Sequence, residues 1–98
     1  MERHLIEAMP AGPELDTLTA VSLGWQPMVE YSASVEWAFD IWRELARRYT
    51  ATSATMQDCG CCVIELFVGK EKISVEGETF PLAVCRAALI AAEMEKEK

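Results

Sequence analysis

The sequence predicts a single domain of the α+β class, in which about four helices pack with a small three-stranded antiparallel sheet. Two observations predict this class. Apolar residues at helical spacing occupy the first half of the chain and return at its end, whereas residues 50–77 alternate in the manner of strands. The 98 residues lie near the commonest domain size and contain no linker-like break, so residues 1–98 are expected to form one domain.

Two helices are expected before the first long loop. Residues 2–9 predict a short helical segment that ends at Pro10. A longer helix is expected to begin near Pro13, because proline favours the first turn of a helix, and to end at Gly24.

The loop of residues 25–33 interrupts the helical pattern, because it has no period and contains Pro27. Its apolar residues Trp25, Met28 and Tyr31 predict that it lies across the domain instead of extending into solvent. This surplus of aromatic side chains makes Trp25 and Tyr31 candidate ligand-binding residues.

The helix of residues 34–49 has the clearest helical period in the chain. Ser32 or Ser34 is expected to cap it. Trp37 and Ile41 lie beside the apolar stripe and widen it, so the helix is expected to be deeply buried or used at an interface. The stripe comprises Val35, Ala38, Phe39, Trp42, Leu45, Ala46 and Tyr49.

Three strands are expected in residues 50–58, 61–68 and 71–77. Their short connections favour an antiparallel meander with the second strand in the centre. In that central strand, Val63 and Phe67 face away from the remaining apolar residues, so both faces are apolar and both are expected to be covered.

A helix from about residue 81 to residue 94 closes the chain. Its alanines Ala83, Ala87 and Ala91 form a small-residue surface suited to close packing on the sheet or on a second copy. A homo-oligomer is therefore one expectation, formed through this surface or through the wide face of the helix that contains Trp37.

The stretch of residues 57–63, QDCGCCV, holds three of the four cysteines. Its Asp and Gly favour a tight hairpin turn, with the thiols serving as small buried hydrophobes. Cys61 and Cys62 are adjacent on a strand and project to opposite faces, which disfavours a shared zinc ion. A redox pair of Cys59 and Cys62 would lie on a hairpin instead of a helix N-terminus. We therefore expect no metal and no cofactor, with the two alternatives left open.

The net charge of −7, from sixteen acidic and nine basic residues, repels phosphate backbones, so nucleic acid is not an expected partner. The one basic cluster is expected at the end of a helix and comprises Arg43, Arg47 and Arg48. Cations at a helix C-terminus complement the negative end of the helix dipole, which explains the cluster without a ligand. The alternative interpretation is a phosphate-binding patch. No apolar run reaches the roughly 20 residues that cross a bilayer, and the N-terminus lacks a signal-peptide pattern. We expect a cytoplasmic protein with no membrane partner.

No glycine-rich phosphate loop, nucleophile elbow or two-metal carboxylate set is present, so an enzyme is not expected; hydrolase-type activity is the weaker alternative.

Arg86 is a lone charge in the run of residues 81–92. It is expected to pair within the fold, with a carboxylate or an aromatic ring. Its alternative role, binding an anionic ligand, makes it the third candidate binding residue beside Trp25 and Tyr31.

Four segments follow one another along the chain: PAGPELDTLTA, LGW, YSASVEWAFDIWREL and GETFPLAVCRAALIAA. In this order and spacing they resemble the phage α/β/α (ABA) sandwich domain family, small proteins encoded by bacteriophages and prophages. The block from Pro81 to Leu89 is the most specific part. The resemblance implies a three-layer α/β/α sandwich with helices on both faces of the sheet, and it carries no enzymatic activity with it.

These observations together predict a non-catalytic phage protein that acts in the cytoplasm of the infected bacterium. Its expected partner is a small-molecule ligand or a host protein. A specific version is that it sequesters a nucleotide-like immune signal, which is an anti-defence function. The alternative is a small assembly module without a ligand.

Overall fold

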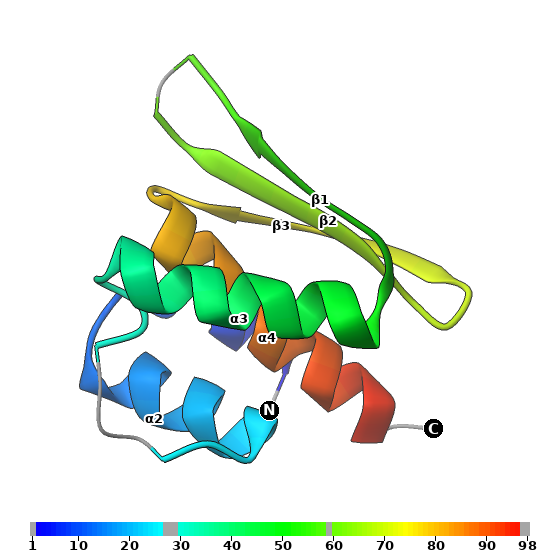
Figure 1. Cartoon of the computed structure of the whole chain (residues 1–98), viewed down its shortest axis with the longest axis horizontal. Helices are drawn as coiled ribbons and strands as arrows, with labels where there is room; N and C mark the ends of the chain where they lie inside the picture. Colours follow the sequence, from blue (N-terminus) through cyan, green and yellow to red (C-terminus); the bar gives the residue numbers. More distant parts are fainter. Residues whose placement is uncertain (1, 27–29, 59, 97–98) are drawn as a thin grey trace.

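The computed structural model describes residues 2–26, 30–58 and 60–96. These residues form four helices and a three-stranded sheet, and the α+β class is confirmed (Figure 1). The elements in chain order are α1 (Arg3–Glu7), α2 (Pro13–Leu23), α3 (Val35–Arg48), β1 (Thr50–Met56), β2 (Cys62–Val68), β3 (Glu71–Gly77) and α4 (Phe80–Lys96).

The sheet is the predicted antiparallel meander, with β2 between β1 and β3. At one end of the sheet, Cys62 pairs with Met56 on one side and with Gly77 on the other. The register between β1 and β2 shifts at a bulge between Thr50 and Ser53. Because side chains alternate along each strand, one face of this sheet carries the apolar residues of β2 and β3.

The described helices lie on one face of the sheet (Figure 1). α4 packs on β2 and β3, α3 packs on β1, and α1 and α2 pack on α4. The layers therefore differ from the expected order with helices on both faces, because the sheet is an outer layer. Val63 and Phe67 are partly buried on its outer face, where polar neighbours such as Glu65 and Lys72, paired at 3.1 Å, accompany them. Glu65 lies in β2 itself, whereas Lys72 comes from β3 and could not be read from the apolar pattern of β2 alone.

The core lies between the sheet and α4, which is buried along most of its length. Ala83, Ala87 and Ala91 are fully buried, so the small-residue surface is used inside the fold and is not available to a second copy. Gly77 approaches the helix so closely that an added Cβ would lie 2.5 Å from the backbone N of Ala83. The inner face of β2 contributes Cys62, Ile64, Leu66 and Val68.

Candidate functional site

A buried carboxylate fixes the segment between α2 and α3. Asp16 is 7% exposed, and its Oδ1 accepts a hydrogen bond of 2.7 Å from the backbone N–H of Ser32. The Ser32 hydroxyl oxygen in turn accepts a bond of 2.9 Å from the N–H of Gly12. These two bonds attach the end of the segment to α2 and so position the neighbouring Tyr31.

Three aromatic rings meet beside this anchor. The ring centroids of Trp25 and Tyr31 are 5.8 Å apart, and those of Tyr31 and Trp37 are 6.4 Å apart in an edge-to-face arrangement. Tyr31 is 6% exposed and its hydroxyl donates to the Gln26 carbonyl at 3.3 Å, whereas Trp37 is 43% exposed. Burial raises the pKa of the Tyr31 hydroxyl, so it stays protonated. The cluster therefore has a fixed, buried centre and an open side. The predicted loop residues Pro27 and Met28 lie outside the described residues.

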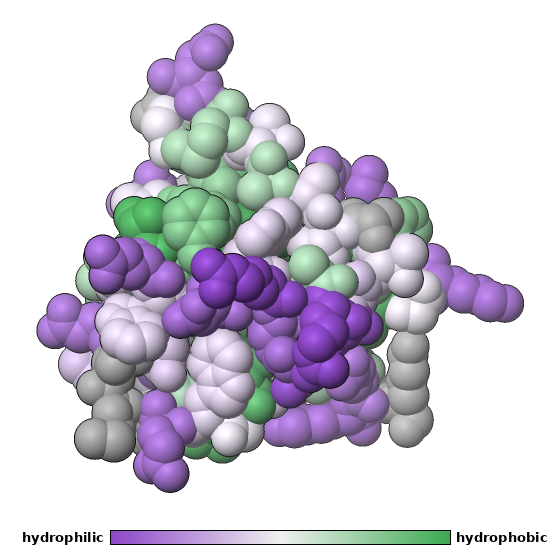
Figure 2. Space-filling model, viewed as in Figure 1, coloured by the Kyte–Doolittle hydropathy of each residue, from purple (hydrophilic) through white to green (hydrophobic). Residues whose placement is uncertain are grey.

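The aromatic cluster lines an open depression of about 490 Å³ beside α3. Two ion pairs form its rim, between Arg43 and Asp40 at 3.3 Å and between Arg47 and Glu44, whose Nε and Oε1 are 3.0 Å apart. The charges of the rim therefore balance. Figure 2 shows the charged surface that crosses α3. The lining residues are Trp25, Tyr31, Trp37, Asp40, Arg43, Glu44 and Arg47.

Glu44 organises the basic cluster at the end of α3. Hydrogen bonds from Arg47 hold the pKa of Glu44 at about 2, against the opposite effect of burial, and Arg48 contributes to the same lowering. Arg48 donates to Glu44 at 2.9 Å and to the Leu23 carbonyl at 3.3 Å, which links α3 to the end of α2. The arginines therefore have carboxylate and carbonyl partners in addition to the favourable helix end expected from the sequence.

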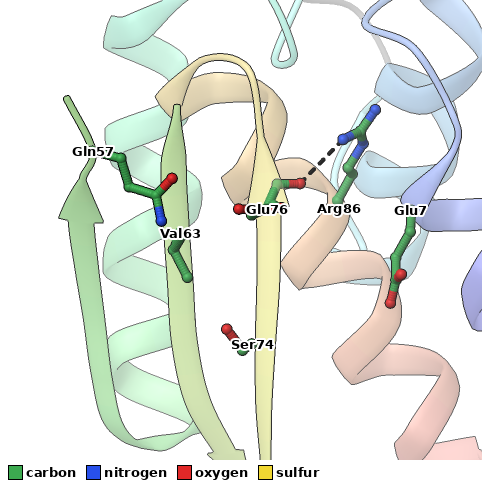
Figure 3. A pocket seen from close by; sticks show the side chains of 6 residues that line it. All are labelled: Glu7, Gln57, Val63, Ser74, Glu76 and Arg86. Carbon is green, nitrogen blue, oxygen red and sulfur yellow. Dashed lines mark hydrogen bonds between the residues drawn. The ribbon is translucent and has the colours of Figure 1, made fainter. Parts of the chain in front are cut away.

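Arg86 lies apart from this depression. Its Nε and Nη2 donate to the Met9 carbonyl at 3.1 and 2.8 Å, and its Nη1 donates to the Glu76 carbonyl at 3.1 Å (Figure 3). The expected partner was a carboxylate or an aromatic ring, but the partners in the structure are backbone carbonyl oxygens. The guanidinium therefore joins α4 to β3 and to the segment that follows α1.

Arg86 borders a second, polar depression of about 460 Å³ at β3 (Figure 3). The structure therefore brings two of the candidate residues, Trp25 and Tyr31, into one site and places Arg86 in another. The residues that line this second depression are Glu7, Gln57, Val63, Ser74, Glu76 and Arg86.

Sequence reasoning missed Trp37 as a site residue. The signal was present, because Trp37 is a large aromatic residue beside the predicted stripe of an otherwise charged helix face. The stripe itself is rotated in the structure, since Val35, Phe39 and Ala46 are exposed. Among the described elements, α3 makes extensive contacts with two, α4 and β1. These contacts cover a narrower face of the helix than the predicted stripe. The fully buried residues of that face are Ala38, Ile41 and Leu45.

The cysteines have the surroundings of structural thiols. Cys62 and Cys85 are buried, and burial raises the pKa of both thiols, to about 12 for Cys85. Reactive cysteines need the opposite shift. Gly60, at φ 90°, lies in the predicted hairpin turn, while Cys59 lies outside the described residues. Across the part of the chain that the structure describes, no three His, Cys, Asp or Glu side chains gather as a metal site would require.

Comparisons with known proteins found no relative: no family model, curated protein or solved structure matches this chain. Within residues 2–26, 30–58 and 60–96, no helix has the length and apolar character of a membrane span. The fold and the site define a small α+β protein with an aromatic depression on its surface, and the function must be inferred from that geometry.

Proposed function

We propose that this chain is a non-catalytic binding protein of phage origin that holds a planar, nucleotide-like small molecule in the aromatic depression. The observation that carries the proposal is the convergence of Trp25, Tyr31 and Trp37 around one open side. The resemblance to the phage ABA sandwich family supports the origin. In the cytoplasm of an infected bacterium, sequestering a nucleotide-like immune signal would act against host defence.

The aromatic cluster has the properties of a stacking platform. Tyr31 is held by burial and by its bond to Gln26, so little side-chain freedom remains to be lost on binding. Trp37 presents a partly exposed ring to the depression. Stacking of a base on an aromatic side chain contributes about 1–3 kcal/mol and tolerates any base, because every base has a π-face.

The rim supplies cations that can turn toward a phosphate. The side chains of Arg43 and Arg47 are 76% and 70% exposed, but only the partner of Arg43 is exposed as well: Asp40 is 42% exposed, whereas Glu44 is 14% exposed. An exposed ion pair such as that of Arg43 with Asp40 stabilises a protein by about 0–1 kcal/mol at most. Exchange of a carboxylate for a phosphate partner therefore costs little, and the new bonds are charge-assisted. Because Asp40 and Glu44 stay nearby, we expect a cyclic dinucleotide or a monophosphate to bind better than a triphosphate.

The ionisable groups of the depression suit binding without chemistry. Glu44 is ionised and engaged by two arginines, with a pKa of about 2, and is a poor general base at neutral pH. The Tyr31 hydroxyl, whose pKa burial raises, is a poor nucleophile. Both observations favour a protein that holds its ligand unchanged.

Ligand capture from infected cells tests the proposal. Wild-type protein and the Trp37→Ala and Phe39→Ala variants would be incubated with the same extract and repurified. Heat would release bound molecules for mass spectrometry. Phe39 is the matched control, because it lies on the same helix and is 48% exposed, close to the 43% of Trp37.

We expect the wild type and Phe39→Ala to enrich the same nucleotide-like species and Trp37→Ala to lose it. Equal recovery from all three proteins, or no small molecule released from the wild type, would contradict the proposed site.

A further inference from the structure

Asp40 is a carboxylate in a depression that is proposed to hold an anionic ligand. It follows Trp37 by three residues and precedes Glu44 by four, so all three side chains lie along one side of α3 and line the depression. After burial, the charge of Asp40 is the next cause of the raised pKa of Tyr31, so the carboxylate acts on the aromatic cluster. A negative charge at this position opposes a phosphate unless it contacts a donor of the ligand.

Glu44, the other carboxylate of the depression, already has both oxygens engaged. Arg47 Nε donates to its Oε1 at 3.0 Å, and Arg48 Nε donates to its Oε2 at 2.9 Å. The Glu44 side chain is 14% exposed, so these charge-assisted bonds are partly shielded from water. Glu44 therefore serves to hold the arginines in place, and Asp40 is the carboxylate that remains to contact a ligand.

The ion pair of Asp40 with Arg43 can separate more readily than the contacts of Glu44. Nη1 of Arg43 lies 3.3 Å from Oδ1 of Asp40, and both side chains are open to solvent. Among the described residues, Arg43 is the one hydrogen-bond partner of Asp40. An exposed pair of this kind contributes little to stability, so it separates readily when both side chains gain new partners.

A nucleotide supplies both new partners if its base presents two donors along one edge. Guanine carries adjacent N–H donors at N1 and at its 2-amino group, and a carboxylate has two oxygens that accept hydrogen bonds and no donor of its own. Adenine and cytosine each present a ring nitrogen acceptor beside the amino group, so one carboxylate oxygen would face a lone pair. Proteins commonly recognise an unpaired base by stacking together with hydrogen bonds to this edge.

We propose that Asp40 makes the aromatic depression selective for guanine nucleotides. The base would stack on Trp37 with its N1 and 2-amino donors on the two oxygens of Asp40, while Arg43 turns from Asp40 to the phosphate. Each member of the ion pair then exchanges one partner for another, and neither is left unpaired. This inference rests on the proposed nucleotide-binding function and adds to it a choice of base, which stacking alone does not make.

Inosine monophosphate (IMP) isolates the contact assigned to Asp40. Its base keeps the ring system, the N1 donor and the 6-oxo group of guanine and lacks only the 2-amino group. Stacking on Trp37 and the phosphate contact are therefore the same for IMP and guanosine monophosphate (GMP). The ratio of their affinities reports on the second hydrogen bond to Asp40, because a site built to accept a donor discriminates against a ligand that lacks it.

Calorimetric titration with GMP, IMP and adenosine monophosphate (AMP) tests the proposal. We expect the wild type to bind GMP about tenfold or more tightly than IMP, because GMP adds one hydrogen bond to a charged acceptor, and to bind AMP most weakly. Asp40→Asn should lose most of this preference, since an amide has one acceptor where the carboxylate has two. Glu36→Gln removes an exposed carboxylate from the first turn of the same helix, outside the depression, and should keep the preference of the wild type.

The comparison of GMP with IMP uses the unaltered protein, so it decides the question even if circular dichroism shows that Asp40→Asn fails to fold. Equal affinities of the wild type for GMP and IMP, or a preference for GMP that survives in Asp40→Asn, overturn the choice of guanine. The nucleotide-binding function still stands in that case, provided that Trp37→Ala loses binding. If the wild type binds none of the three nucleotides, the proposed function and this inference are both overturned.

Discussion

Arg86 and the backbone carbonyl of Met9 are joined by two hydrogen bonds, of 3.1 Å from Nε and 2.8 Å from Nη2, across 77 positions of the chain. The remaining terminal nitrogen, Nη1, donates to the Glu76 carbonyl. One side chain on α4 therefore holds both the segment after α1 and the last strand. This arrangement makes Arg86 a structural residue whose loss should be felt in stability.

We expect Arg86→Met to lower the free energy of unfolding by about 2–6 kcal/mol, because the carbonyl oxygens of Met9 and Glu76 both lose their donor and each unsatisfied group costs about 1–3 kcal/mol. Arg86→Lys should recover part of this loss, since an ammonium group cannot bridge both carbonyls. Thermal melts without ligand measure the effect. An unchanged or higher melting temperature for Arg86→Met would contradict the structural role.

Asp16 should be required for the position of the aromatic cluster. Asp16→Ala leaves the buried N–H of Ser32 without its acceptor, which costs about 1–3 kcal/mol. Asp16→Asn keeps an oxygen in the same place and should lose less. Urea titrations would rank the variants, and the near-ultraviolet circular dichroism of the aromatic residues should weaken most in Asp16→Ala. Equal losses in both variants would show that the hydrogen bond is unimportant.

Gly77→Ala should destabilise the contact between β3 and α4. The new Cβ would lie 2.5 Å from the backbone N of Ala83, so the strand or the helix must shift. Overpacking of this kind costs about 1–3 kcal/mol and sometimes more. Urea titration measures the loss, and a variant as stable as the wild type would mean that the two elements are less closely packed.

Much of the fold could be predicted from local patterns. The change from helical to alternating spacing near Tyr49 marks the start of β1, and the short connections fix the meander. The layer order could not be predicted, because the covering of a sheet face depends on all its strands. Val63 and Phe67 suggested a covered outer face, but the facing residues of β1 and β3 are largely polar, such as Thr55 and Lys72.

The site was only partly predictable for the same reason. The density of aromatic residues in one loop indicates Trp25 and Tyr31, but the contact of Tyr31 with Trp37 is a tertiary contact between the end of that loop and α3, which local patterns do not show. The partners of Arg86 are backbone carbonyls, and every residue has one, so sequence alone offers no signal for them.

Stability should depend on the ionisation of Glu44 at low pH. The pKa of Glu44 is about 2 in the folded protein, below its ordinary value of 4.5, because Arg47 and Arg48 donate hydrogen bonds to it. A lowered folded pKa stabilises the protein above pH 4.5, and this contribution is lost as the pH falls from about 4.5 toward about 2.

Glu44→Gln removes this contribution, so the wild type should be more stable than the variant near neutral pH. The difference should shrink as the pH falls through that window. Urea midpoints of both proteins across the acid range measure it, and a constant difference at every pH would assign the effect to packing instead of charge.

Calorimetric titration with nucleotides tests the aromatic depression most directly. Cyclic dinucleotides and mononucleotides would be added in turn to the wild type, Trp37→Ala and Phe39→Ala. We expect saturable binding to the wild type and to Phe39→Ala, and affinity about tenfold or more lower for Trp37→Ala, because one stacked base contributes about 1–3 kcal/mol. If the wild type binds none of these nucleotides, or if Trp37→Ala binds them as tightly as the wild type, the aromatic depression is not a nucleotide-binding site.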